Sequence, residues 1–165
     1  DWAERNVRVT QRTDFPYADT TKLTIEGGGA FDVRIRVPRW ATAGYLVSIN
    51  GRPEPVKAEP GSYLTLRRTW RANDTIEVRI PFAFHLAPVM DQPNVASIFY
   101  GPVLLAAEET APRTDWRPIA LVAGGLGASA AGDPSTLRFT IDGVPFKPFF
   151  ETYDRSSVYL HVTMR

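Results

Sequence analysis

Residues 31–40 read FDVRIRVPRW, in which apolar and polar side chains alternate. Because successive side chains of a β-strand point to opposite faces, this alternation predicts a strand with one buried face and one solvated face. The same pattern returns in YLTLRRTW (63–70) and in DTIEVRI (74–80), while FYGPVLLAA (99–107) adds a largely apolar run. The stretch from Phe31 to Ala107 therefore predicts a succession of strands with almost no helical periodicity.

The inward positions of these strands are apolar and define the expected core. They are Phe31, Val33, Ile35, Val37, Val47, Ile49, Leu64, Leu66, Ile76, Val78 and Ile80. Two shorter strands are expected before them, over Asn6–Arg12 and Thr20–Glu26. Two more are expected near the end, over Leu137–Ile141 and Val158–Thr163.

Turn signals separate the predicted strands. Asn50-Gly51 favours a type I′ hairpin turn, because both residues tolerate positive φ. Pro60-Gly61 and Asn73-Asp74 mark further turns, and the 14 prolines argue against any long helix. Many short strands at this spacing are typical of an all-β, antiparallel β-sandwich, which we expect to be jelly-roll-like.

Composition predicts three segments along the chain. We expect residues 1–107 to form the main β-sandwich and residues 108–135, rich in Gly, Ala and Pro, to form a long loop. Residues 136–165 are expected either to close the same sandwich or to begin a second one. The chain starts at Asp1 and ends within a strand-like pattern, so we expect both ends to be cut from a longer polypeptide.

The bulk composition narrows the classes of partner. A formal net charge of +1 provides no general attraction for nucleic acid or for anionic membranes. The absence of cysteine excludes disulfides, thiolate nucleophiles and cysteine-bound zinc within the chain. No apolar run approaches the roughly 20 residues that span a bilayer, so we expect a soluble protein. The compartment stays open, with the bacterial cytoplasm or periplasm as the expectation.

Three motifs that could carry chemistry have simpler structural interpretations. The segment Ile119–Ala130 contains G-x-G-x-x-A, but a dinucleotide site needs a longer helix and a parallel crossover. His85 and His161 are the only histidines and show no ligand spacing. The 18 acidic residues leave a glycosidase pair possible, although five aspartates lie in turn-like contexts, namely Asp14, Asp19, Asp74, Asp91 and Asp133.

Exposed aromatic and arginine side chains are the remaining candidates for an interdomain or sugar contact. Arg34 and Arg36 share the outward face of one predicted strand, and Arg39 follows it. They predict either a docking surface or an ordinary solvated face. Trp40 and Trp116 are candidate sugar platforms, whereas Trp70 is expected in the core or at its rim.

The order of several landmarks resembles glycoside hydrolase family 127, the β-L-arabinofuranosidase-like enzymes formerly called DUF1680. The resemblance covers about residues 1–107, with a further match in the tail VPFKPFFE (144–151). The landmarks are Pro38-Arg39-Trp40, Asn50-Gly51, Pro60–Leu64, Trp70, Ile80-Pro81 and Tyr100–Val103.

The resemblance implies a β-sandwich that follows a catalytic (α/α)6 barrel in the parent hydrolase. In that family a cysteine nucleophile and a zinc ion belong to the barrel, so no catalytic, cofactor or metal residue is expected in this chain. The resemblance thus implies a non-catalytic accessory domain whose partner is the upstream catalytic domain. Two alternatives remain open: an independent carbohydrate-binding module with exposed aromatic residues, and a carboxylate-based glycosidase.

Overall fold

The computed structural model describes all 165 residues and divides them into two compact units, Asp1–Phe82 and Ala83–Arg165. Strands dominate both units, which confirms the all-β prediction. The helical segments are η1 (Ala3–Arg5), α1 (Leu126–Ser129) and η2 (Phe149–Glu151). None of them has the length and apolar character needed to cross a membrane.

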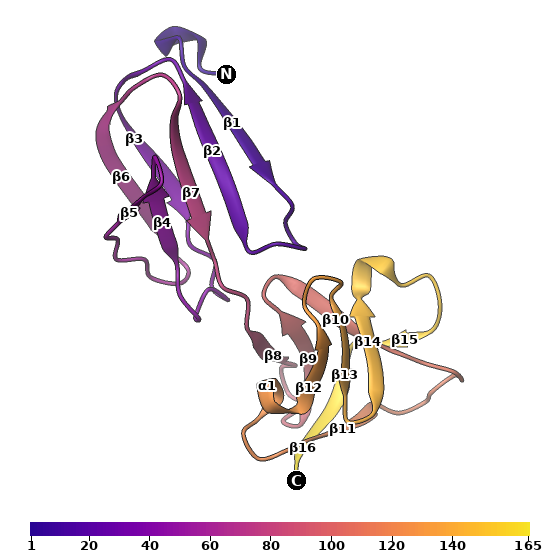
Figure 1. The fold of residues 1–165 in the computed structure, drawn as a ribbon. Helices are drawn as coiled ribbons and strands as arrows, with labels where there is room; N and C mark the ends of the chain where they lie inside the picture. Colours follow the sequence, from indigo (N-terminus) through magenta and orange to yellow (C-terminus); the bar gives the residue numbers. More distant parts are fainter. The chain divides into compact units, whose positions relative to one another are not determined.

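The first unit is a sandwich of two antiparallel sheets (Figure 1). The larger sheet has the strand order β1-β2-β7-β4-β5, and the smaller one pairs β3 with β6. The strands are β1 (Arg8–Thr13), β2 (Thr20–Glu26), β3 (Gly29–Arg36), β4 (Leu46–Ile49), β5 (Arg52–Glu54), β6 (Tyr63–Trp70) and β7 (Asp74–Arg79).

The core of the first unit lies between these two sheets. Eight of the eleven predicted core residues are buried, while Phe31, Val33 and Ile35 on β3 pack against the core but stay partly exposed. Trp70 is 1% exposed, as expected for a core residue, and its Nε1–H donates to the Phe31 carbonyl at 2.9 Å. This bond ties β6 to β3 within the smaller sheet.

A buried carboxylate fixes two turns of the first unit to each other. Asn50 and Gly51 have φ values of 53° and 75°, as the type I′ prediction requires, and they join β4 to β5. The Asn50 amide donates to Asp74 at 2.8 Å, and the Arg71 backbone N–H donates to the other Asp74 oxygen at 2.8 Å. These hydrogen bonds, led by the one from Arg71, lower the pKa of Asp74.

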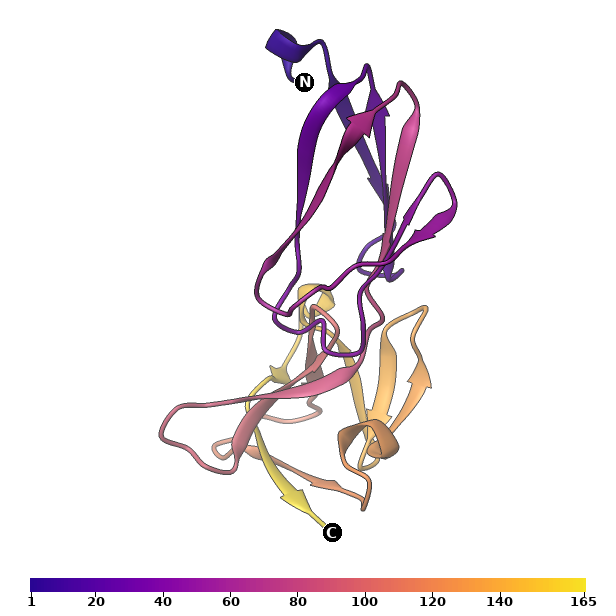
Figure 2. The same cartoon turned by 90° about the vertical axis from the view of Figure 1, so that its left-hand side faces the viewer.

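The second unit is built on one nine-stranded, curled sheet, whose curl is visible in Figure 2. Its main order is β11-β16-β9-β10-β14-β13-β12, with β8 paired to β9 and β15 paired to β10. The strands are β8 (Phe84–Pro88), β9 (Val95–Tyr100), β10 (Val103–Glu108), β11 (Arg117–Leu121), β12 (Ala130–Asp133), β13 (Arg138–Ile141), β14 (Val144–Pro148), β15 (Ser156–Ser157) and β16 (Leu160–Met164). All its pairings are antiparallel except β11 with β16, which is parallel.

The domain boundaries predicted from composition need correction. The units divide after Phe82, and residues 83–107 belong to the second unit because β9 and β10 pair with β16 and β14 from the end of the chain. Residues 108–135 are not one long loop, since they contain β11, α1 and β12. Residues 136–165 therefore complete the second unit rather than the first.

A second buried carboxylate holds the second unit together at its β15 edge. Glu109 follows β10, and its side chain is 5% exposed. It accepts hydrogen bonds from the Arg117 guanidinium at 2.7 and 2.5 Å and from the Ser157 hydroxyl at 2.7 Å. The pKa of Glu109 is lowered, mainly by the hydrogen bonds from Arg117.

We predict that Asp74→Asn lowers the free energy of unfolding by about 2 kcal/mol at pH 7, since hydrogen bonds to a charged group contribute about 1.5–3 kcal/mol. Because the folded-state pKa of Asp74 is lowered, its contribution is present above the ordinary carboxyl pKa and is lost as pH falls through the folded value. The difference between the two proteins should therefore shrink below about pH 4. Urea unfolding across pH measures it, with Glu77→Gln on the exposed face of β7 as the control.

We predict that Glu109→Gln destabilises the chain by about 3 kcal/mol, because it leaves the Arg117 guanidinium, with 20% of its side chain exposed, without its carboxylate. The matched control is Glu59→Gln, whose ion pair with Lys57 is exposed and should contribute less than about 0.5 kcal/mol. Equal melting temperatures for the two variants would contradict a structural role for Glu109.

Candidate functional site

An apolar groove opens along one side of the first unit, where β1 and β2 lie across from β3. Its volume is about 540 Å³. Its lining includes Val9 from β1, Leu23 from β2, and Val33 and Ile35 from β3. Val9 occupies an inward position opposite the fully buried Ile25, yet 46% of it is exposed. The groove is thus a part of the sandwich interior that this chain leaves open to solvent.

Tyr45 lies at the end of this groove and donates its hydroxyl to the Arg36 carbonyl at 3.2 Å. Burial raises the pKa of Tyr45 to about 12, so the phenol remains protonated at neutral pH. The groove contains no carboxylate or histidine. The lining is predominantly apolar, which suits the packing of apolar side chains.

The three candidate arginines lie close together in sequence on the first unit but do not converge on one point. Arg34 and Arg36 are exposed on β3, and the Arg34 guanidinium lies 6.0 Å from the centre of the Tyr63 ring. Arg39 packs beside Gly61: a Cβ added to Gly61 would lie 3.2 Å from the Arg39 Cγ. The three side chains form an exposed basic edge. Arg34 and Arg36 share the outward face of β3, as their spacing predicted.

Trp40 is less available to a sugar than the sequence indicated. It is partly buried and packs against Phe82 at 5.6 Å and Phe15 at 6.3 Å between ring centres. Phe15 also contacts Phe82 edge to face at 5.4 Å. Because its neighbours are 25 and 42 residues away along the chain, sequence spacing gave no sign of this cluster.

Trp116 belongs to the second unit and lies beside Tyr159, which the sequence analysis did not single out. Their ring centres are 5.9 Å apart, and their planes meet at 78°. Both residues are 49% exposed, and both line a cavity of about 580 Å³ together with Thr114, Asp115 and Ser156. Trp116 is the candidate platform that the structure leaves most accessible.

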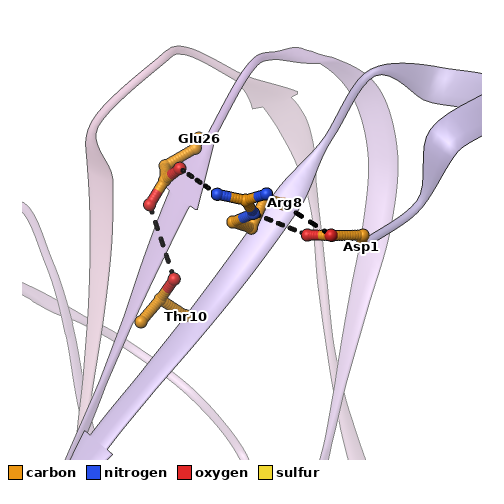
Figure 3. Close-up of polar contacts among 4 residues, drawn as sticks. All are labelled: Asp1, Arg8, Thr10 and Glu26. Carbon is orange, nitrogen blue, oxygen red and sulfur yellow. Dashed lines mark hydrogen bonds and ion pairs between the residues drawn. The ribbon is translucent and has the colours of Figure 1, made fainter.

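A pair of carboxylates lies at the start of the first unit, on either side of Arg8 (Figure 3). The Arg8 Nε lies 2.6 Å from Asp1, and its Nη1 lies 3.8 Å from Glu26, which also accepts the Thr10 hydroxyl at 3.4 Å. The two carboxylate side chains are 65% and 49% exposed. A glycosidase acid needs a desolvated carboxyl group, so this site is better described as a surface ion-pair bridge.

The two histidines and the Gly-rich motif lie in separate elements of the second unit. His85 stacks on Phe99 at 5.2 Å, and His161 lies in β16, within the strand predicted for it. No three His, Asp or Glu side chains gather where a metal ion could be held. The Gly-rich motif leads into the four-residue helix α1 and then into β12, which pairs antiparallel with β13. This geometry lacks the long helix and parallel crossover of a dinucleotide site.

Comparison with known proteins gives consistent matches. The family model "Beta-L-arabinofuranosidase, GH127 middle domain" matches residues 1–82, which are the residues of the first structural unit. A curated relative, the non-reducing end beta-L-arabinofuranosidase of Bifidobacterium longum subsp. longum, is 27% identical over 135 residues. The match covers 74% of this chain and 20% of that protein.

Solved structures share the fold of the chain. A GH127 beta-L-arabinofuranosidase from Geobacillus stearothermophilus T6 matches 95% of this chain with a TM-score of 0.73 and 19% identity. A second GH127 beta-arabinofuranosidase gives a TM-score of 0.71 at 19% identity over the same share. The chain spans about a third of each of these solved chains and a fifth of the curated relative. The first unit, residues 1–82, belongs to the family of GH127 middle domains.

Proposed function

We propose that this chain is a non-catalytic accessory domain that packs on an upstream catalytic (α/α)6 barrel and stabilises it or shapes its entrance. The match of its first unit to the GH127 middle domain supports the accessory role. Most of the length of its relatives lies outside the matched region, which leaves room for a catalytic domain. In this proposal the nucleophile and any zinc ion belong to that domain, because this chain supplies no cysteine.

The open groove of the first unit is the observation that carries this proposal. Apolar side chains from β1, β2 and β3 line it, and Val9 is half exposed although Ile25, its partner on β2, is fully buried. Domains of one polypeptide commonly bury about 600–1,500 Å² against each other. A helix or strand of the catalytic domain seated on Val9, Leu23 and Val33 would remove this apolar surface from water.

The exposed arginines extend the proposed interface. Arg34 and Arg36 lie on β3, which also forms one wall of the groove. An acidic partner surface would add charge complementarity at the rim, where it affects association rate and register more than affinity. The basic edge would therefore fix the direction in which the partner lies in the groove.

A second candidate function is carbohydrate binding through exposed aromatic residues. One observation favours it: Trp116 and Tyr159 are both half exposed and line the same cavity of the second unit. This function is compatible with the first, because the two surfaces belong to different structural units.

We predict that Val9→Asp weakens binding of the separately produced catalytic domain at least 10-fold, because it places a charge in the apolar groove. The matched control is Arg12→Asp, three residues along the same strand and outside the groove lining, which should change binding less than 3-fold. Isothermal titration calorimetry measures both affinities. Thermal unfolding of each variant alone should show little change, since both positions are exposed.

The proposal fails if the unmodified chain neither binds the catalytic domain nor raises its melting temperature. It also fails if Val9→Asp and Arg12→Asp weaken binding equally, because the groove would then not be the contact surface.

A further inference from the structure

The Trp116–Tyr159 pair is placed on a rigid base. Trp116 directly precedes Arg117, and Tyr159 lies two residues after Ser157, so each aromatic residue is close in sequence to a residue that hydrogen-bonds Glu109. The parallel pairing of β11 with β16 begins at Arg117 and Leu160, immediately after the two aromatic residues. The backbone segments that carry both aromatic residues are therefore held by these hydrogen bonds and by the β11–β16 pairing.

Such anchoring matters for binding because it lowers the entropy lost when a ligand arrives. An aromatic side chain on a mobile loop would have to be immobilised by the ligand, whereas these two already hold each other edge to face at 5.9 Å. Both residues are half exposed, so a ligand could remove further aromatic surface from water. The geometry is that of a prepared contact surface.

Polar groups complete the lining of the 580 Å³ cavity. They include the Thr114 hydroxyl, which donates to Asp115 at 2.7 Å, together with Ser156 and Arg113. Glu109 is bound by Arg117, and the Arg113 charge also acts on Glu109 from the cavity lining. The cavity thus offers hydroxyl, carboxylate and guanidinium groups around an aromatic wall, within the size range of about 300–1,000 Å³ typical of small-ligand sites.

We propose that this cavity is a binding subsite for a neutral oligosaccharide. A sugar ring presents an apolar C–H face, which packs on an aromatic plane, and a rim of hydroxyls that both donate and accept hydrogen bonds. Trp116 and Tyr159 meet the first requirement, while Arg113, Asp115 and Ser156 meet the second. The Asp115 carboxylate in the lining would repel a strongly anionic ligand, which favours a neutral one.

The angle between the rings restricts how a glycan can lie. At 78° the two planes cannot form one flat platform, so a single extended chain cannot stack on both rings at once. A terminal sugar fits better, with one ring against its face and the other against its edge. The subsite therefore selects chain ends or bends. This inference rests on the second proposed function, carbohydrate binding, and is independent of the groove in the first unit.

We expect an ¹⁵N-labelled sample of the whole chain to show saturable shifts of the Trp116 indole signal when neutral arabinotriose or galactotriose is added. Measured by isothermal titration calorimetry, Trp116→Ala and Tyr159→Ala should each weaken binding at least 10-fold, and Trp116→Phe should retain more affinity than Trp116→Ala because it keeps an aromatic face. Tyr153→Ala is the matched control, since Tyr153 is 92% exposed in the same unit and does not line the cavity. It should leave binding unchanged.

Three outcomes would overturn the subsite. The first is that neither neutral trisaccharide shifts the indole at millimolar concentration. The second is that the anionic trigalacturonate binds more tightly than both. The third is that the catalytic domain shifts the Trp116 signal while the sugars do not, which would make this face a protein contact. Trp116→Ala should not alter binding of the catalytic domain through the Val9 groove, so failure of the subsite is distinguishable from failure of the docking proposal.

Discussion

The unequal width of its two sheets shapes the first unit. Neighbouring strands lie about 4.8 Å apart, so five strands span about 19 Å and two strands span about 5 Å. The β3–β6 pair cannot cover the whole inner face of the larger sheet. Val37, Ile76 and Val78 are fully buried, whereas Val9 at the β1 edge remains half exposed. The apolar groove follows directly from this mismatch.

Buried carboxylates fix the segments that the sheets alone do not hold. In the first unit Asp74 joins the β4–β5 turn to the start of β7, and in the second Glu109 joins the end of β10 to β11 and β15. Each carboxylate accepts several hydrogen bonds, which offset the free-energy cost of removing its charge from water. Glu109 in turn fixes the segments that carry Trp116 and Tyr159. Stability and the proposed carbohydrate contact thus depend on the same network.

Local patterns predicted the first unit well and the second poorly. Alternation in residues 31–40 and 74–80 located β3 and β7, and Asn50-Gly51 located a hairpin, because each signal depends on adjacent residues. The division after Phe82 depends instead on pairing of β9 with β16, more than 60 residues apart. The contact of Trp116 with Tyr159 arises in the same way from the parallel β11–β16 pair, which has no local signature. Arg34 and Arg36 were placed correctly on one exposed face, but Trp40 was not, since its aromatic neighbours are distant in sequence.

Thiol protection in the groove tests the central claim most directly, because the chain contains no native cysteine to interfere. Val9→Cys places one thiol in the groove, and Arg12→Cys places one outside its lining on the same strand. The account predicts that adding the catalytic domain slows maleimide labelling at position 9 at least 10-fold and changes labelling at position 12 much less. Equal labelling at position 9 with and without a bound catalytic domain would contradict it.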